Sequence, residues 1–372
     1  MERTEIESET LQDVLSRVEV LEPRRAGIDS WKSHGVNVGW LLGSGSFADV
    51  HTVSQGRSTS FQKMQSDENV TNSTFTGSES SVGESVFGKH YEDVHSSHKF
   101  AIKRLRKEFW PSEGTSQRHH AVVDFLYEAE ILARLPQHKN IIALQAISEN
   151  FHEEPGRGFL VLEKAQYTLD DRLNEWKRIE QTRKKGPRIP FVSGRMAGST
   201  RLRQLQAKRI RAGAQGIAEG LLFLHQNNVV FRDLKPANCA FALDGTVKIL
   251  DFGLARPYGA GEKRLTGKVG TTRFMAPEVA TSQDYSFAAD VYSFALLLWQ
   301  ICTLQVPYKK LTTVAEWFEH VVHSEKRPKC KPSCIPSPLL GDLIQKAWSS
   351  RPSHRPSFDS ICHKLKEEAD FA

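Results

Sequence analysis

One short segment, Phe231–Asn238, restricts the fold and the chemistry of this chain more than any other part of it. It carries the carboxylate of Asp233, the ammonium of Lys235 and the amide of Asn238 within six residues, directly after the apolar pair Val229-Val230. Such an apolar run predicts a buried strand, so the three polar groups are expected on the loop that follows it. Because loops rarely gather such different groups by chance, this loop predicts a chemical site.

A second loop of the same kind follows. Asp251-Phe-Gly253 comes thirteen residues after Asn238, at the end of the apolar run Val247–Leu250. Carboxylate and amide oxygens on adjacent loops suit Mg²⁺, a hard ion that prefers oxygen ligands. The alternative is that Asp and Asn here only form ordinary turns. The joint spacing of the two loops favours the metal site.

A glycine-rich turn lies near the start of the chain, within Leu42–Val50. Backbone N–H groups at such a turn can approach phosphates closely, and side chains at Gly43 and Gly45 would obstruct that approach. Taken alone, the pattern is more often a simple hairpin. It therefore needs support from other residues.

That support comes from a cation on a predicted strand and an anion on the predicted helix that follows it. Lys103 ends the predicted strand Lys99–Lys103, and Glu128 lies on a predicted helix, Val122–Leu135. Glu128 is favoured over Glu130 as the partner of the lysine because apolar residues follow Glu128 at the three- and four-residue spacing that faces a core. The alternative for both charged groups is an ordinary solvated surface.

The chain divides by composition. Residues 1–35 form an acidic N-terminal extension in which Leu11, Val14, Leu15 and Val18 predict one face of a short helix. Residues 54–97 contain 11 serines and 4 threonines and predict a disordered insert.

A second insert is predicted from charge, at residues 177–211, with 12 Lys or Arg residues and the single acid Glu180. This run is either an ordinary solvated surface or a contact for nucleic acid, anionic lipid or another acidic partner.

The location of the protein is also predicted from sequence. The N-terminus lacks the basic start and apolar core of a secretion signal, and no stretch has the length of a membrane span. The five cysteines show no disulfide pattern, and the pair Cys330 and Cys334 near His323 has no second pair to complete a metal site. We expect an intracellular protein, cytoplasmic or nuclear, without a transmembrane segment.

These motifs, in this order, resemble a eukaryotic protein kinase domain over residues 36–367. The resemblance implies an α+β, bilobal fold, with a small β-rich N-lobe at about 36–163 and a larger, mainly helical C-lobe at about 164–367. It also implies ATP and Mg²⁺ as cofactors and proteins as substrates.

By this resemblance, Asp233 accepts the proton of the substrate hydroxyl, Lys235 neutralises the γ-phosphate, and Asn238 and Asp251 hold Mg²⁺. Thr271 matches the threonine that bridges the catalytic base and the lysine. The implied nucleotide-binding residues are Leu42, Gly43, Gly45, Val50, Ala101, Lys103, Glu128 and Glu163.

Other matches concern structure and specificity. Glu278 and Arg355 resemble a buried ion pair of the family, and Asp290 resembles the aspartate that braces the catalytic loop. Lys235 and Thr271 favour serine or threonine as acceptor. The segments Arg273–Glu278 and Asp290–Trp299 resemble the tyrosine-kinase-like group, so dual specificity stays open, and a pseudokinase scaffold is the other alternative.

Three positions depart from the family pattern. Ala48 replaces the third glycine of the glycine-rich turn, Phe231 replaces a histidine, and Ala240 replaces a leucine that forms the floor of the adenine pocket. We expect the aromatic ring of Phe231 to pack in the core without the hydrogen bond that the imidazole makes near Asp251. We expect a roomier pocket at Ala240.

Regulation is predicted from two arginines. Arg232 and Arg256 together suit the oxygens of a phosphate on the segment Leu254–Met275, which resembles the activation segment of the family, with Thr266 and Thr272 as the candidate acceptors. Either an activating kinase or autophosphorylation would supply that phosphate. The alternative is that both guanidiniums only solvate the surface.

Overall fold

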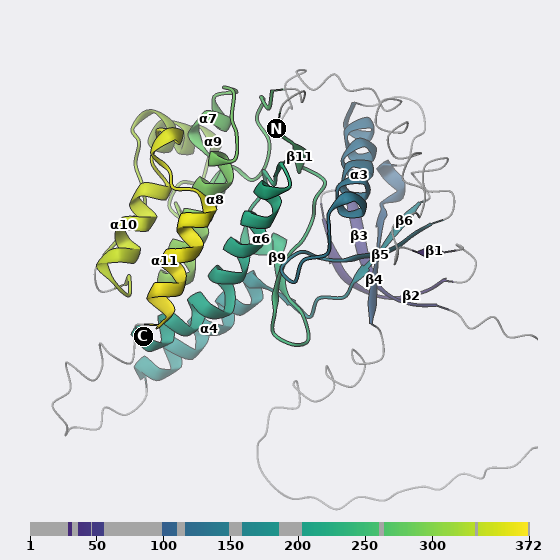
Figure 1. Ribbon diagram of the computed structural model, residues 1–372, viewed down its shortest axis with the longest axis horizontal. Coiled ribbons are helices and arrows are strands. Elements are labelled where there is room, and N and C mark those ends of the chain that lie inside the picture. The colour runs from purple at the N-terminus through teal and green to yellow at the C-terminus, as the bar shows by residue number, and fades with distance from the viewer. Residues whose placement is uncertain are drawn as a thin grey trace, which may run out of the picture.

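The computed structural model describes residues 29–31, 36–45, 47–55, 99–109, 116–148, 158–185, 203–259, 264–331 and 334–370. The helical face predicted at 11–18, nearly all of the insert predicted at 54–97, and the centre of the basic insert lie outside these ranges. The described residues form the two lobes that the resemblance implies, with a twisted sheet and one long helix in the smaller lobe and helices in the larger (Figure 1).

The smaller lobe is built on a six-stranded sheet with the strand order β1-β5-β6-β4-β3-β2. Its strands are β1 (Asp29–Trp31), β2 (Val36–Ser44), β3 (Ala48–Gln55), β4 (Phe100–Leu105), β5 (Leu144–Ser148) and β6 (Phe159–Glu163). Neighbouring strands are antiparallel except β1, which pairs in parallel with β5. The sheet therefore begins before residue 36, and the predicted boundary of the N-terminal extension is too late.

Both faces of this sheet are apolar where neighbours cover them. Ile102, Phe159 and Val161 belong to a small cluster on one face, whereas Leu160 and Leu162 belong to the main core with helix α3 (Ser116–Arg134). This alternation follows from the two-residue period of side chains along a strand. The packing of α3 against the sheet brings Glu128 close to Lys103 on β4.

The larger lobe is mainly helical. Its helices include α4 (Leu169–Lys185), α6 (Gln215–Gln226), α7 (Pro277–Ala280), α8 (Ala288–Thr303), α9 (Val314–Trp317), α10 (Pro338–Ala347) and α11 (Phe358–Asp370). Short pieces complete it: π-helical turns η3 (Ile210–Ala214) and η6 (Phe318–His323), and 3₁₀ turns η4 (Pro236–Asn238), η5 (Thr272–Phe274) and η7 (Pro352–His354), while η2 (Lys107–Phe109) lies in the smaller lobe. Nearly every residue of α8 is buried, so α8 forms the centre of this lobe.

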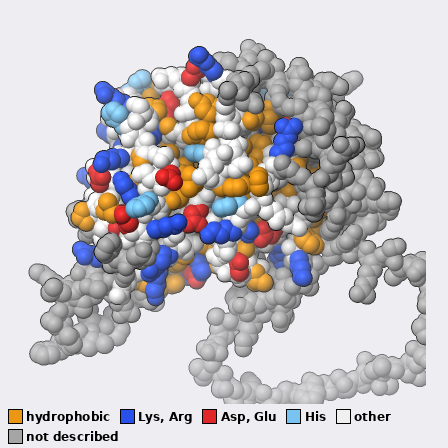
Figure 2. All heavy atoms as spheres, viewed as in Figure 1, with side chains coloured by type: hydrophobic (Ala, Val, Ile, Leu, Met, Phe, Trp, Pro, Cys, Tyr) orange, Lys and Arg blue, Asp and Glu red, His pale blue; other side chains and the backbone are white. Residues whose placement is uncertain are grey.

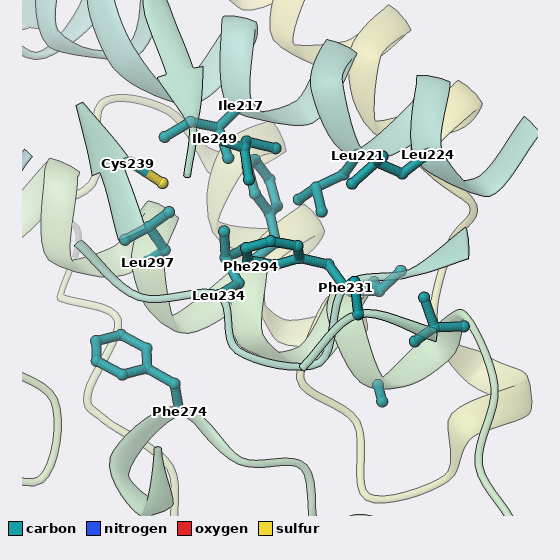
Figure 3. Close-up of a cluster of buried hydrophobic side chains, with 14 of the residues drawn as sticks. Ile217, Leu221, Leu224, Phe231, Leu234, Cys239, Ile249, Phe274, Phe294 and Leu297 are labelled. Atoms are coloured by element: carbon teal, nitrogen blue, oxygen red, sulfur yellow. The ribbon is translucent and has the colours of Figure 1, made fainter. Parts of the chain in front are cut away.

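Two small sheets carry the polar loops. β7 (Tyr167–Thr168), β9 (Cys239–Phe241) and β10 (Val247–Ile249) form one, and β8 (Val229–Val230) pairs with β11 (Arg256–Pro257) in the other. The catalytic-loop residues Phe231 and Leu234 are buried among Leu221 and Leu224 of α6 and Phe294 of α8 (Figure 3). Apolar side chains of the loop thus anchor it, which leaves its polar groups facing the other way.

The basic insert is shorter than the sequence predicts. Residues 177–185 continue helix α4, and residues 203–209 are helical and lead through η3 into α6. Arg209 is buried, forms an ion pair with Glu180 and lies near the ring of Trp176. The ends of the predicted insert are therefore part of the helical packing. Within it, the single acid, Glu180, neutralises Arg209.

The described surface does not carry a patch of one charge on the face seen in Figure 2, where Lys and Arg side chains are interspersed with Asp and Glu. Among the helices of the described ranges, none combines the length and apolarity needed to cross a membrane.

Candidate active site

A cleft of about 770 Å³ lies between the lobes. Every predicted nucleotide-binding residue lines it: Leu42, Gly43, Gly45, Val50, Ala101, Lys103, Glu128 and Glu163. Asp233, Lys235, Asn238 and Asp251 line it as well, so the structure brings together groups that lie more than 200 residues apart in the sequence. The cleft can hold a ligand the size of a nucleotide.

The glycine-rich turn between β2 and β3 closes through a backbone hydrogen bond from Gly45 to the carbonyl of Ala48, at 2.8 Å. A Cβ atom at Gly43 would meet nothing within 4 Å, so an open approach to its backbone exists from the cleft. The methyl group of Ala48 is buried, which shows that a small side chain suffices at this departure from the family pattern.

Lys103 joins the two predicted anions. Its Nζ lies 2.5 Å from Glu128 Oε2 and 2.8 Å from Asp251 Oδ1. Burial opposes the charge on Lys103, but the Asp251 and Glu128 carboxylates outweigh that penalty and hold the pKa of the ammonium above its usual value. In turn, Lys103 holds the pKa of Asp251 below its usual value. Asp251 is therefore ionised and ready to bind a cation.

Burial raises the pKa of Glu128, and the neighbouring Lys103 partly offsets this increase. A carboxylate buried in this way would be costly without its partner, because its charge would face no compensating group. The ion pair with Lys103 therefore couples the position of α3 to that of β4.

The carboxylate of Asp233 is held at both oxygens. Oδ2 accepts hydrogen bonds from Lys235 Nζ at 2.6 Å and Asn238 Nδ2 at 3.0 Å, and Oδ1 accepts from the backbone N–H and the hydroxyl of Thr271 at 2.9 and 2.7 Å. Lys235 also donates to the Thr271 hydroxyl at 3.0 Å. The network fixes the carboxylate with few rotational alternatives, as a positioned proton acceptor requires.

The donor set of Asn238 and Asp251 fits Mg²⁺. The amide nitrogen of Asn238 donates to the backbone carbonyl and the carboxylate of Asp233, so its amide oxygen is left as the ligand atom. Asp251 contributes one oxygen to Lys103, and its side chain is half exposed to the cleft. Two oxygen ligands complemented by water and substrate phosphates are the usual protein share of a Mg²⁺ site.

The two loops adopt backbone conformations that only their surroundings can hold. Arg232 has φ +71° and Asp251 has φ +64°, in the left-handed region that is uncommon for residues other than glycine. The carboxylate of Asp290 accepts from the backbone N–H groups of Phe231 and Arg232, both at 2.8 Å. The predicted brace on the catalytic loop therefore forms, and it acts directly on the strained residue.

Phe231 packs as the sequence suggests. Its ring is fully buried and meets the ring of Phe252 edge to face, with centroids 5.3 Å apart. An apolar contact between the two loops thus takes the place of the polar one expected of histidine. Ala240 lines the cleft, in agreement with its predicted place at the adenine pocket.

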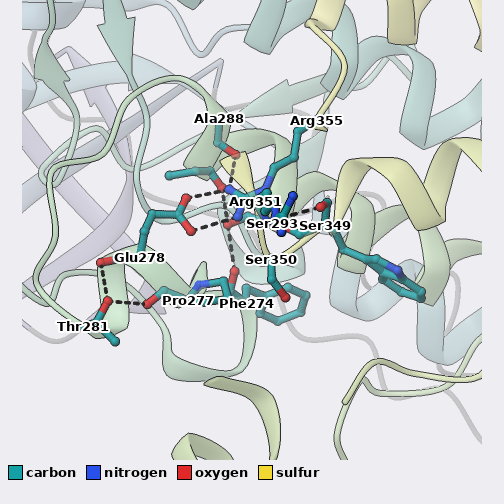
Figure 4. A network of polar contacts seen from close by, with 12 residues as sticks. Phe274, Pro277, Glu278, Thr281, Ala288, Ser293, Ser349, Ser350, Arg351 and Arg355 are labelled. Atoms are coloured by element: carbon teal, nitrogen blue, oxygen red, sulfur yellow. Dashed lines mark hydrogen bonds and ion pairs between the residues drawn. The ribbon is translucent and has the colours of Figure 1, made fainter. Parts of the chain in front are cut away.

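The buried pair of Glu278 and Arg355 also forms, and it is bidentate (Figure 4). The two Arg355 nitrogens donate to the two carboxylate oxygens at 2.5 and 2.8 Å, and Arg355 also donates to the carbonyls of Ala288 and Ser349. The pair connects the end of the activation segment to the C-terminal part of the larger lobe.

The two arginines of the predicted phosphate site are already engaged. Arg232 donates to the carbonyl of Leu254 at 2.5 Å and to the hydroxyl of Tyr285 at 2.9 Å. Arg256 is buried and forms an ion pair with Asp124 on α3. The phosphate site at Thr266 or Thr272 stays a prediction, and in this structure both guanidiniums have protein partners.

Sequence reasoning missed the outer wall of the cleft, which Tyr167, Thr168 and Asp171 form near the start of α4. Thr168 donates through its backbone N–H and its hydroxyl to Asp171 Oδ2 at 2.9 and 2.7 Å, and the N–H of Asp171 donates back to the hydroxyl. A Thr followed three residues later by an acid is a recognisable helix start, so this signal was present in the sequence.

Gly270 gives a first prediction. A Cβ at this residue, which has φ +91°, would lie 2.5 Å from the carbonyl oxygen of Arg232, so Gly270→Ala is expected to displace Thr271 from Asp233. We expect steady-state kinetics of the variant to show a loss of about 100-fold in kcat. Gly245→Ala is the matched control, because Gly245 has φ +82° with no atom near its Cβ position. Equal losses in both variants would contradict the role of Thr271.

Comparison with known proteins agrees with this geometry. The family described as protein tyrosine and serine/threonine kinase matches residues 76–365. The chain is 40% identical over 163 residues to a probable serine/threonine-protein kinase of Dictyostelium discoideum, which covers 44% of this chain and 11% of that protein. It is 38% identical over 154 residues to the serine/threonine-protein kinase STY17 of Arabidopsis thaliana, which covers 41% of this chain and 26% of that protein.

A third relative carries a broader name. The dual specificity protein kinase shkB of Dictyostelium discoideum is 38% identical over 156 residues, which is 41% of this chain and 24% of that protein. The chain thus spans between about a tenth and a quarter of the length of these relatives.

Proposed function

Because the chain belongs to the family of protein tyrosine and serine/threonine kinases, we propose that it transfers the γ-phosphate of ATP to serine and threonine hydroxyls of protein substrates. The observation that carries the proposal is the network in which Asp233 holds Lys235, Asn238 and Thr271 beside the Lys103–Asp251 pair. The charged and metal-binding groups that the family uses for phosphoryl transfer are present in it: Lys103, Asp233, Lys235, Asn238 and Asp251. This completeness argues against the pseudokinase alternative.

The residues divide the reaction between them. Lys103 would orient the α- and β-phosphates, and Asn238 and Asp251 would hold Mg²⁺, which would supply positive charge against the phosphate oxygens. Asp233 accepts the proton of the substrate hydroxyl. The oxygen of that hydroxyl bonds to the γ-phosphorus, and the bond between the γ-phosphorus and the bridging oxygen that leaves with ADP breaks. Lys235, placed 2.6 Å from Asp233, neutralises the transferred group.

The preference for serine and threonine rests on Lys235 and Thr271. Their contact at 3.0 Å keeps the lysine over the catalytic carboxylate, which is the arrangement expected for a small alcohol acceptor. Some relatives are named dual specificity kinases, so tyrosine phosphorylation is the second candidate activity. Phosphoamino-acid analysis of labelled substrate separates the two.

Partners and location complete the proposal. The basic segment from 177 to 211 would contact acidic partners, with an affinity that falls as salt is added. Thr266 and Thr272 stay the candidate acceptors of a phosphate added by the enzyme itself or by an activating kinase. The expected location is cytoplasmic or nuclear.

The test of phosphoryl transfer is timed incorporation of labelled phosphate from ATP with Mg²⁺ into a mixed peptide library. Asp251→Asn is expected to lower the initial rate by about 100-fold or more, because it removes the charge of a proposed metal ligand that is also one of the two anionic partners of Lys103. Asp284→Asn, which removes the carboxylate of an exposed ion pair with Arg264, is the matched control and should label at the wild-type rate. Equal labelling by the Asp251 variant and the wild type would refute the proposal.

A further inference from the structure

Arg256 is buried on a segment where the sequence suggested a solvent-exposed phosphate ligand. It is 5% exposed and lies on β11, five residues after Asp251. One guanidinium nitrogen donates to the carbonyls of Gly253 and Ala255, both at 2.8 Å, and the other donates to Asp124 Oδ1 at 3.1 Å. Its guanidinium carbon lies 3.6 Å from the centre of the Tyr127 ring. Each contact leads either to helix α3 or to the turn that follows Asp251.

The location of Asp124 gives this ion pair its importance. Asp124 precedes Glu128 by four residues, so the two carboxylates lie one turn apart on the same face of α3. Glu128 contacts Lys103, and Asp124 contacts Arg256. Helix α3 therefore forms an ion pair with Lys103 at one turn and, at the adjacent turn, an ion pair with the segment that follows Asp251.

The backbone of the turn after Asp251 also lies close to the backbone of α3. A Cβ at Gly253 would lie 3.3 Å from the carbonyl oxygen of Asp124, so the turn after Asp251 packs directly against α3. A displacement of the helix would have to break the Asp124–Arg256 pair and separate two buried charges. Such a break is strongly unfavourable, because neither charge would regain water without a larger opening.

The same pair has a consequence for regulation. The carboxylate of Asp124 occupies the anionic position beside Arg256, where the sequence suggested a phosphate. An added phosphate would meet a like charge there. Arg232 is directed elsewhere, to the carbonyl of Leu254 and the hydroxyl of Tyr285.

We propose that the Asp124–Arg256 ion pair holds α3 in the position that places Glu128 on Lys103, so that the nucleotide site assembles without a phosphate on the activation segment. Arg256 is then a positioning residue that acts through α3. This inference rests on the proposed kinase activity for its kinetic consequences, whereas its structural consequence does not depend on catalysis.

The test uses the full chain with Asp124→Asn, Arg256→Met and the double variant. Each single change is expected to lower kcat/KM for ATP by about 10- to 100-fold, with a raised KM for ATP, because Glu128 and Lys103 lose their alignment. The double variant should lose no more than the worse single variant, because both changes break one contact. Arg256→Lys, which keeps the charge, should recover a large part of the loss.

A merely structural role predicts a different result: fewer active molecules, and so a lower kcat, with an unchanged KM for ATP. Arg264→Met is the matched control, because Arg264 forms an exposed ion pair with Asp284 on the same segment. It should behave as the wild type. Wild-type protein treated with phosphatase, and shown by intact mass to carry no phosphate, should keep its rate.

Two further outcomes decide the proposal. Single variants with wild-type KM for ATP, or a phosphatase-treated protein as slow as Arg256→Met, would overturn it. Hydrogen exchange of the α3 amides, measured without nucleotide, separates it from the kinase proposal: exchange should be faster in Arg256→Met than in Arg264→Met. If that difference appears while no substrate is labelled, the kinase proposal fails and the structural contact stands.

Discussion

Asp233→Asn is expected to lower the rate of phosphate transfer by about 10³-fold, the largest loss of activity from any single change. The substitution removes the proton acceptor. It also places an amide where Lys235, Asn238 and Thr271 all present donors to Asp233. Single-turnover phosphate transfer at saturating ATP measures the effect on chemistry apart from nucleotide binding.

The matched control for this change is Asp342→Asn, which alters an exposed carboxylate paired only with Lys346 on α10. Its rate should equal that of the wild type. ATP binding by the Asp233 variant, measured by titration, should stay close to the wild-type value, because Lys103 and Glu128 are untouched. A rate within tenfold of the wild type would show that another group accepts the proton.

Glu278→Gln is expected to produce the largest loss of stability, about 3–5 kcal/mol. It removes the charge that compensates Arg355, whose guanidinium is buried and bound at both of its terminal nitrogens. Arg355 would keep its bonds to Ala288 and Ser349, yet its charge would remain without water or an anion. The measurement is urea unfolding followed by fluorescence.

The control again is Asp342→Asn, because its pair with Lys346 is exposed and spaced by four residues on one helix. Such pairs contribute about 0.3–0.5 kcal/mol, so the midpoint of unfolding should hardly move. Equal shifts for the two variants would mean that burial does not distinguish the two ion pairs, and the structural role of Glu278 would be lost.

The sequence predicted the contact between Lys103 and Glu128. Lys103 and Glu128 lie on a strand and a helix whose apolar periods fix which way each side chain points, so their contact follows from local patterns. The catalytic loop was equally clear, because Asp233, Lys235 and Asn238 come directly after the apolar pair Val229-Val230, which predicts a buried strand. Local rules sufficed wherever one side of an element is buried.

Contacts between residues far apart in the sequence could not be predicted from apolar periods where the residues show no such period. Strand β1 has three residues and no apolar period, and it pairs in parallel with the edge of β5. Arg209 was counted within a charged run predicted to be either solvated surface or a contact for acidic partners, although it is buried, pairs with Glu180 and lies near the ring of Trp176. Charge by itself does not show whether a side chain has a partner.

Arg256 is the clearest case of what each level determines. The sequence determined the chemical groups and their order, because strand and helix periods and the spacing of the loops are local properties of the chain. The tertiary structure decided that Arg256 meets Asp124, which lies 132 residues away in the sequence. The reason is physical: burial makes an unpaired charge costly, and only the packing of α3 against the turn after Asp251 brings the compensating carboxylate within reach.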